Sequence, residues 1–274
     1  MSDSKEHNTG YLESVFSLKN KVILFTVATG GIGRVICRGY AKAGASVALC
    51  DMDEGILAEL EAEISSDGGE ASRFLLDLSR MEDIPVCVNS VIKKYGRIDV
   101  LFNCAGINKR EGMLDVEEST YDRIMQINLK GLFFISQETA KYMMKAGRGS
   151  IINMASHNSV GMLGGCSVYG ATKSAVTALT RSMAVEWAKF GIRANAIAPG
   201  HILTPLTTVT WDHPTRSVYL RERIATGRPG TPEEIVGTAI LLASDASTYM
   251  SGMMIHIDGG CLAGGAPWDY DTKY

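Results

Sequence analysis

Tyr169 and Lys173 stand four residues apart in a segment with helical spacing, so their side chains share one face of the expected helix. A free tyrosine titrates at about pH 10, and a nearby ammonium favours the phenolate by about 1–3 pKa units. A tyrosine tuned in this way can exchange a proton with an alcohol or a carbonyl oxygen. The pair alone carries little weight, because a Tyr and a Lys on one exposed helix face also occur together by chance.

Ser156 adds a hydroxyl to this pair. It ends the apolar run "IINMAS", which predicts a strand, and it precedes Tyr169 by 13 residues. An open parallel sheet presents its ligand crevice at the carboxyl ends of its strands, so a serine there can bond a substrate oxygen and orient it. The alternative is an ordinary turn serine at the end of a strand.

A glycine-rich turn indicates a second kind of chemistry. The segment "ATGGIGR" follows the strand-like run "VILFT", and Gly31 and Gly33 let the backbone approach a pyrophosphate at the amino end of a helix that begins near Ile32. Asp51 lies 18 residues after Gly33, where a carboxylate can bond an adenosine ribose and repel a 2′-phosphate. The pattern predicts NAD as the cofactor and disfavours NADP. The alternative is a tight turn beside a surface Asp.

The elements that must position these residues alternate between short apolar runs and helical patterns. This alternation predicts the α/β class: a single-domain Rossmann fold across residues 19–262, with a doubly wound parallel seven-stranded sheet and helices on both faces. The third strand is expected within residues 72–79. Two helices are expected at residues 117–128 and 132–145.

Three segments do not fit the alternation. Residues 1–18 are polar and predict a flexible N-terminal leader, with Phe16 and Leu18 docking just before the first strand. Residues 205–230 are long for a connection and predict a lid over the substrate. Residues 263–274 form a C-terminal tail that could reach a neighbouring subunit.

Bulk composition narrows the function classes. The net charge of −3 and the scattered basic residues argue against nucleic acid or an acidic membrane surface as the main partner. The longest apolar runs are too short to span a bilayer, and the N-terminus lacks an apolar signal core. The six cysteines are dispersed without metal-ligand spacing, which favours reduced thiols in a cytoplasmic protein and no metal site.

Taken in order, "TVATGGIG", "NCAG", "INLKG", Ser156, "YGATK" and "PGHILT" resemble the short-chain dehydrogenase/reductases over nearly the whole chain. The resemblance implies hydride transfer between a nicotinamide dinucleotide and an alcohol or ketone, with Asn128, Ser156, Tyr169 and Lys173 as the catalytic set. It also implies that Asn128 holds a water linking Lys173 to solvent. From its position alone, Asn128 could equally be a helix C-cap.

The resemblance extends the cofactor site beyond the glycine turn. It implies contacts along the dinucleotide from the ends of successive strands. The full set of expected cofactor-binding residues is Thr26, Gly31, Ile32, Gly33, Asp51, Asp77, Leu78, Asn103, Ala105, Gly106, Tyr169, Lys173, Pro199, Ile202 and Thr204.

Two residues depart from the family pattern. Cys104 replaces the second Asn of an NNAG motif, and Val27 replaces the first glycine of the turn. A β-branched residue at positive φ is a steric outlier, so either φ stays negative at Val27 or the turn is strained. We expect weaker NAD binding than a glycine would allow.

Residues that follow the motifs are candidates for the substrate pocket. They are polar and partly basic: Asn108, Arg110, His157, His201 and Trp211. Such a set suits a hydroxylated or anionic small molecule. Within the family the chain resembles the gluconate 5-dehydrogenase-like sugar-acid and polyol oxidoreductases, and the resemblance implies a homotetramer. Two alternatives stay open: a 3-oxoacyl-carrier-protein reductase, and a non-catalytic dinucleotide-sensing protein, which Val27 alone suggests.

Overall fold

A computed structural model describes residues 10–265 of the chain. Within this range seven parallel strands form one sheet in the order β3-β2-β1-β4-β5-β6-β7. The chain winds outward from β1 to β3 and then returns to β4 on the other side of β1, which creates a switch point between β1 and β4. The strands are β1 Val22–Thr26, β2 Ser46–Asp51, β3 Glu70–Leu75, β4 Val100–Asn103, β5 Gly149–Met154, β6 Ile192–Pro199 and β7 Met254–Ile257. The doubly wound seven-stranded prediction is confirmed.

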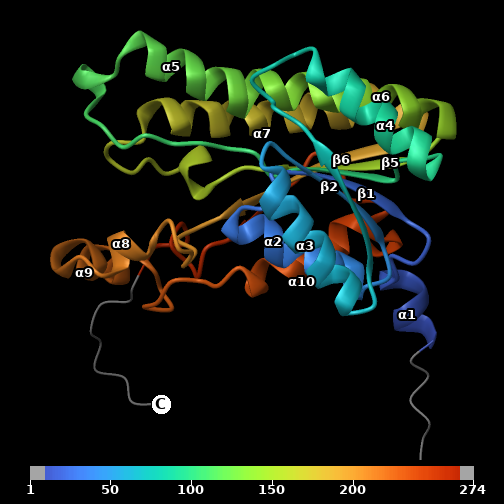
Figure 1. Ribbon diagram of the computed structural model, residues 1–274. Coiled ribbons are helices and arrows are strands. Elements are labelled where there is room, and N and C mark those ends of the chain that lie inside the picture. Colours follow the sequence, from blue (N-terminus) through green and yellow to red (C-terminus); the bar gives the residue numbers. More distant parts are fainter. Residues whose placement is uncertain (1–9, 266–274) are drawn as a thin grey trace, which may run out of the picture.

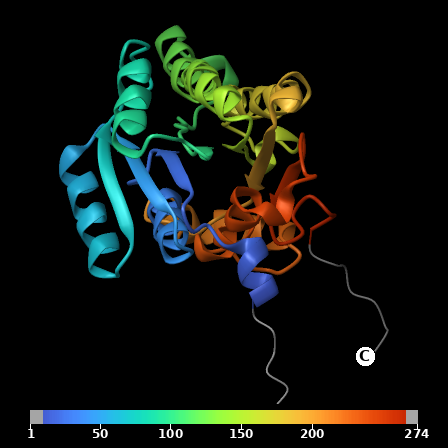
Figure 2. The same ribbon diagram turned by 90° about the vertical axis from the view of Figure 1, so that its right-hand side faces the viewer.

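Helices cover both faces of the sheet (Figures 1 and 2). One face carries α2 Gly31–Lys42, α3 Glu54–Ser66 and α10 Glu233–Ala243, and the other carries α4 Asp83–Tyr95, α6 Leu132–Ala146 and α7 Ser167–Trp187. Because both faces are covered, the strands read as continuous apolar runs, and all five residues of β1 are buried.

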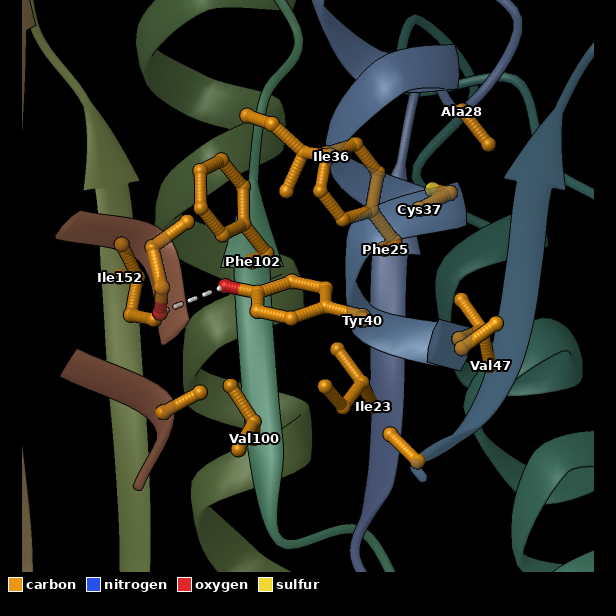
Figure 3. Close-up of a cluster of buried hydrophobic side chains, with 14 of the residues drawn as sticks. Ile23, Phe25, Ala28, Ile36, Cys37, Tyr40, Val47, Val100, Phe102 and Ile152 are labelled. Atoms are coloured by element: carbon orange, nitrogen blue, oxygen red, sulfur yellow. Dashed lines mark hydrogen bonds between the residues drawn. The ribbon is translucent and has the colours of Figure 1, made fainter. Parts of the chain in front are cut away.

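The core beneath α2 is built around three aromatic rings (Figure 3). Phe25 of β1 stacks on Phe102 of β4 with ring centroids 4.6 Å apart, and Tyr40 of α2 meets both rings edge-on. The buried Tyr40 hydroxyl donates to the carbonyl of Ala239 in α10 at 3.1 Å. These contacts fix α2, and therefore the glycine turn at its amino end, against the first two strands of the switch point.

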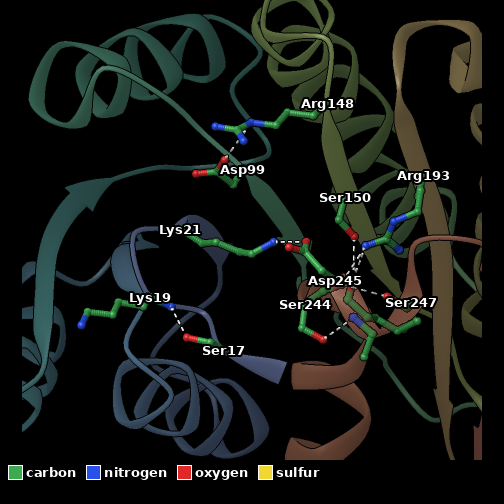
Figure 4. A network of polar contacts seen from close by, with 12 residues as sticks. Ser17, Lys19, Lys21, Asp99, Arg148, Ser150, Arg193, Ser244, Asp245 and Ser247 are labelled. Atoms are coloured by element: carbon green, nitrogen blue, oxygen red, sulfur yellow. Dashed lines mark hydrogen bonds and ion pairs between the residues drawn. The ribbon is translucent and has the colours of Figure 1, made fainter. Parts of the chain in front are cut away.

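The amino ends of the strands are fastened by polar contacts (Figure 4). Lys21, just before β1, pairs with Asp245 at 2.6 Å, and Asp99, just before β4, accepts from the Val22 N–H at 2.9 Å. Arg193 of β6 donates to the Leu242 carbonyl at 3.0 Å. These contacts fasten the amino edge of the sheet. The loops that carry the expected substrate residues leave from the opposite, carboxyl edge.

The N-terminal segment differs from the prediction. Residues 10–16 form a short helix, α1 Gly10–Phe16, where a flexible leader was expected. Leu18 is fully buried in the core beside α2, as expected, but Phe16 stays 41% exposed because it lies on the outer side of this helix end. Residues 1–9 and most of the expected C-terminal tail, residues 266–274, lie outside the described range.

Two element boundaries also differ from the prediction. The third strand ends at Leu75, so residues 76–79 form the turn that follows it. The expected helix at 117–128 splits into α5 Glu118–Met125 and a π-helix, η2 Gln126–Gly131. Apolar periodicity predicts a helix but does not distinguish a π-turn within it.

The expected lid contains two helices, α8 Thr208–Trp211 and α9 Pro214–Arg223. Its two ends meet where Ile202 forms an isolated bridge with Gly230. The Leu203 N–H donates to the Gly230 carbonyl at 2.8 Å, and the Gly230 N–H donates to the His201 carbonyl at 2.9 Å. The insertion is therefore anchored at its base. Across residues 10–265, no helix combines the length and the apolar character needed to span a bilayer.

We expect Tyr40→Phe to lower the free energy of unfolding by about 1 kcal/mol, because it removes one buried hydrogen bond and keeps the ring packing. Urea denaturation measures the change, and Tyr249→Phe is the matched control, since that ring is fully exposed. Equal effects of the two substitutions would contradict the role given to the Tyr40 hydroxyl.

Candidate active site

The candidate site lies at the carboxyl ends of β1, β4, β5 and β6, around the switch point. Parallel pairing places Thr26, Asn103 and Asn153 side by side on three neighbouring strands, so the loops after these strands emerge together. The sheet topology thereby gathers residues that are more than a hundred positions apart in the sequence.

The glycine turn has the geometry of an anion site. Helix α2 begins at Gly31, and its N-cap, Gly30, is extended and offers no side-chain cap, so side chains leave the first N–H groups of the helix free. A Cβ on Gly33 would lie 2.4 Å from the Val27 carbonyl oxygen, and a Cβ on Gly31 would lie 3.2 Å from the Cβ of Thr204. Glycine is therefore required where the backbone packs most closely. An uncapped helix end beside bare backbone fits a pyrophosphate.

Asp51 lies beside this turn at the end of β2 and is nearly buried. Its Oδ2 accepts from the backbone N–H of Thr29 at 3.1 Å and from the Thr29 hydroxyl at 2.5 Å, and its Oδ1 accepts from the Met52 N–H at 2.8 Å. These donors hold the carboxylate at the turn. Sequence reasoning missed Thr29, because nothing in the local pattern relates it to an acid 22 residues later.

The other expected adenosine-side residues follow β3. Asp77 accepts from the backbone N–H and the hydroxyl of Ser79 at 2.8 and 2.7 Å, which shapes a turn, while Leu78 is buried in the apolar core. Val27 also packs against this core, and its φ of +56° is left-handed. Of the two possibilities weighed for Val27, the structure therefore shows the strained one.

Thr26 and Asn103 are buried, and their side chains bond other parts of the protein. The Thr26 hydroxyl accepts from the Cys104 N–H at 3.0 Å, which ties the end of β1 to the loop after β4. The Asn103 amide donates to Ser136 and Asn153 at 2.9 and 2.8 Å, while its Oδ1 is buried without a partner among the described residues. Both side chains thus position the loop after β4. Of the two, only Asn103 keeps an oxygen that accepts no hydrogen bond from the described residues.

Tyr169, Lys173 and Ser156 come together between β5 and α7. The Lys173 Nζ lies 5.7 Å from the Tyr169 ring centroid and donates to the Met154 carbonyl at 2.7 Å. Ser156 follows β5 and accepts from the Asn158 N–H at 3.1 Å. The Tyr169 ring therefore lies near the Lys173 ammonium, with Ser156 beside the Tyr169 hydroxyl, while their role as a catalytic set stays a prediction.

The charge balance at Tyr169 differs from the expectation. Burial raises the pKa of Tyr169, and a hydrogen bond with Ser156 opposes that rise. Burial also lowers the pKa of Lys173 to about 8, since its ammonium is removed from water. The Lys173 ammonium donates its hydrogen bond to a backbone carbonyl and not to the Tyr169 hydroxyl. The predicted lowering of the Tyr169 pKa by Lys173 is not found.

Asn128 lies in the π-helix η2 and is fully buried. Its Oδ1 accepts from the Ile107 N–H at 2.8 Å, and its amide donates to the Ile107 carbonyl at 2.9 Å and to Thr172 at 3.2 Å. Asn128 therefore joins the loop after β4 to α7. A Cβ on Gly106 would lie 3.0 Å from the Lys173 Nζ, so the neighbouring glycine leaves room for the ammonium.

The segment after β6 closes over the glycine turn. Pro199 ends β6 in the core, Ile202 is buried, and Thr204 lies against Gly31. The Thr207 hydroxyl donates to the Ile202 carbonyl at 2.7 Å and accepts from the Thr204 N–H at 2.8 Å. Of the expected residues, Thr204 thus lies against Gly31, and Thr207, which the sequence did not reveal, supports the segment from Ile202 to Thr204.

Four of the five substrate candidates form one cluster. The rings of His157 and His201 lie 4.6 Å apart, and the Trp211 ring meets His201 edge-on at 6.3 Å. Burial lowers the pKa of His201 to about 4, and the charges of His157 and Arg110 act in the same direction. Arg110 also donates to Thr210 of α8 at 3.3 Å. Asn108 stands apart and donates to the Cys166 thiol at 3.3 Å.

The described residues contain no group of three His, Cys, Asp or Glu side chains that could hold a metal ion. The six cysteines are unpaired, and burial raises the pKa of Cys104 to about 12. The thiol beside the loop after β4 is therefore neutral.

Comparison with known proteins gives relatives along nearly the whole chain. A family model described as enoyl-(acyl carrier protein) reductase matches residues 27–261. The 2-dehydro-3-deoxy-D-gluconate 5-dehydrogenase of Escherichia coli (strain K12) is 38% identical over 253 residues, which cover 91% of this chain and 98% of that protein. The 3-oxoacyl-(acyl-carrier-protein) reductase of Thermotoga maritima is 38% identical over 247 residues, covering 89% and 99%. A gluconate 5-dehydrogenase from Burkholderia cenocepacia J2315, in complex with NADP and tartrate, has a TM-score of 0.89 at 34% identity and covers 92% and 99%.

We expect Val27→Gly to tighten NADH binding several-fold, because it removes both the side chain and a backbone strain of about 1–3 kcal/mol at the turn. Fluorescence titration with NADH measures the change. Asn20→Gly is the control, since Asn20 is the other described non-glycine residue at positive φ (+65°) and lies at the opposite end of β1. Equal affinities of wild type and Val27→Gly would refute the claim.

We expect Ser156→Ala to shift the pH–rate profile of alcohol oxidation to higher pH. The hydrogen bond from Ser156 lowers the pKa of Tyr169, so its loss raises that pKa, and the phenolate needed to accept a proton forms only at higher pH. Initial rates across pH 6–11 on the most active substrate test this. A lower rate with an unmoved profile would mean that Ser156 only positions the substrate.

Proposed function

Since the chain belongs to the short-chain dehydrogenase/reductase family, we propose that it interconverts a secondary alcohol and a ketone on a sugar acid or polyol, with NAD(H) as the hydride carrier. The observation that carries the proposal is that Tyr169, Lys173 and Ser156 lie near one another at the same carboxyl edge of the sheet as the uncapped glycine turn. A proton-transfer set and an anion site at one edge of the sheet are what coupled proton and hydride transfer require.

Each member of the set has a distinct proposed task. Ser156 bonds the substrate oxygen, and Tyr169 passes a proton to that oxygen or takes one from it. Lys173 holds a positive charge near the phenol and is available to a cofactor ribose. Asn128 completes the set by fixing Ile107 and by holding a water between Lys173 and solvent. The nicotinamide dinucleotide, when bound, accepts or supplies the hydride.

Asp51 supports NAD over NADP. Its carboxylate stands at the end of β2 beside the glycine turn, where a ribose 2′-phosphate would meet a buried negative charge. The same proposal includes two further sets of expected contacts. The pyrophosphate is contacted by Gly31, Ile32, Gly33 and Thr204, and the adenine by Asp77 and Leu78. The Burkholderia structure was solved with NADP, so relatives of this fold also accept the phosphorylated cofactor.

The histidine cluster supports a polyhydroxylated or anionic substrate. His157, His201, Arg110 and Trp211 present polar edges around the place where Ser156 would hold the reacting oxygen. The second candidate is reduction of a 3-oxoacyl thioester, which the similarity to the Thermotoga reductase favours. An acyl chain would leave the imidazoles without partners, so we rank it second.

We also propose a homotetramer in the cytoplasm. Helices α6 and α7 expose Phe133, Phe134 and Val185 on their outer surfaces, an apolar area suited to a second copy. The thiols of Cys50 and Cys87 lie 3.7 Å apart and unbonded, which fits a reducing compartment.

A substrate panel tests the proposed function. D-gluconate and D-threitol are offered with NAD⁺ or NADP⁺, and acetoacetyl-coenzyme A with NADH or NADPH. We expect turnover of a polyhydroxylated member with a preference for NAD⁺ of about tenfold or more. We also expect Tyr169→Phe to lower kcat by about 10²–10⁴-fold while NADH still binds. Tyr249→Phe is the control. Unchanged kcat in Tyr169→Phe, or turnover of the thioester alone, would overturn the proposal.

A further inference from the structure

His157 and His201 reach the same place from two neighbouring strands. His157 directly follows Ser156 in the short turn η3 His157–Ser159 after β5, and His201 follows the end of β6. Their ring centroids lie 4.6 Å apart at an interplanar angle of 55°. The Trp211 ring closes the far side of His201. The two imidazoles therefore lie together as one surface. That surface is next to Ser156, the proposed holder of the reacting oxygen, because His157 is the next residue in the chain.

Two unpartnered atoms indicate which nitrogen of His157 carries its proton. The His157 Nδ1 and the Asn158 Oδ1 are both buried, and neither meets the geometry of a hydrogen bond with another described residue. The Asn158 side chain nevertheless favours the protonated imidazole, as a nearby acceptor does. A proton on Nδ1 would offer the Asn158 oxygen a donor and so give both atoms a partner. The Nε2 of a neutral His157 then keeps a free lone pair.

The surroundings keep both rings uncharged. Burial lowers the pKa of both His157 and His201. A positive charge on a neighbour acts in the same direction: one on His256 would lower the pKa of His157, and that of Arg110, or one on His157, lowers the pKa of His201. Asp258 faces both rings and opposes the shift without reversing it. At neutral pH the pair thus offers hydrogen-bond acceptors and donors without charge.

We propose that His157 and His201 act as a pair of neutral imidazoles that bond a substrate hydroxyl on a carbon next to the reacting one. The inference rests on the proposed function, because Ser156 must hold the reacting oxygen for its neighbour to reach the adjacent carbon. A hydroxyl satisfies a free imidazole nitrogen, whereas a methylene leaves it unpaired in a desolvated place. The pair would therefore select polyhydroxylated substrates over acyl chains.

Binding without turnover tests this. D-gluconate and its monodeoxy analogues at C2, C3, C4 and C6 are titrated calorimetrically into the NADH-bound protein at pH 7.5, where alcohol and reduced cofactor cannot react. We expect at least one analogue to bind about tenfold or more weakly than D-gluconate. His157→Leu and His201→Leu should reduce that discrimination to under about threefold. His201→Gln, which keeps a polar group, should restore part of it.

His213→Asn is the matched control. His213 caps α9 by accepting from the Thr215 and Arg216 N–H groups, and an asparagine can also cap a helix, so discrimination should stay at the wild-type value. Unchanged discrimination in both leucine variants would overturn the inference, as would an equal loss for all ligands. Failure of every polyhydroxylated ligand to bind a protein that still binds NADH would also overturn it. Discriminating binding without turnover would count against the proposed reaction alone.

Discussion

A buried ammonium is the constraint on which the rest of the site depends. The Lys173 side chain is 2% exposed and donates to the Met154 carbonyl, the last residue of β5. Its pKa falls from 10.5 to about 8, which corresponds to about 3 kcal/mol of unfavourable burial at neutral pH. Because the unfolded chain binds the proton more tightly, this cost is complete below pH 8 and is relieved as the pH rises toward 10.5. The fold carries this destabilisation at the place where the chemistry is proposed.

The neighbouring residues are arranged around this charge. Gly106 leaves the space that the ammonium needs, and Asn128 binds both backbone groups of Ile107, so the loop after β4 stays against α7. The π-turn at residues 126–131 directs Asn128 inward. The Asn103 oxygen, the His157 Nδ1 and the Asn158 oxygen are buried without a partner among the described residues in the loops after β4 and β5. Several of the buried polar atoms without a partner among the described residues thus lie at the carboxyl edge of the sheet.

The expected adenosine side of the cofactor site combines a strained residue with a well-bonded one. Val27 adopts a left-handed backbone that glycine would adopt without strain, while Asp51 accepts from two donors on Thr29 of the same turn and from the Met52 N–H. The turn is therefore tied to β2 through Thr29 and strained where it leaves β1. Under the proposed function, the buried carboxylate would discriminate between the two cofactors, and the valine would limit how tightly either one binds.

The sequence by itself determined the alternation of strands and helices, the glycine turn, and the residues Ser156, Tyr169 and Lys173, because periodicity and fixed local spacing are written along the chain. It could not determine the sign of the Tyr169 shift, because burial and the direction of the Lys173 hydrogen bond are set by β5 and the loop after β4. It named Asp51 but not Thr29, and His157 and His201 but not their contact, since each pair joins segments from different strands. Only the tertiary structure decided these, because pKa values and ring contacts depend on distances in space that no spacing along the chain fixes.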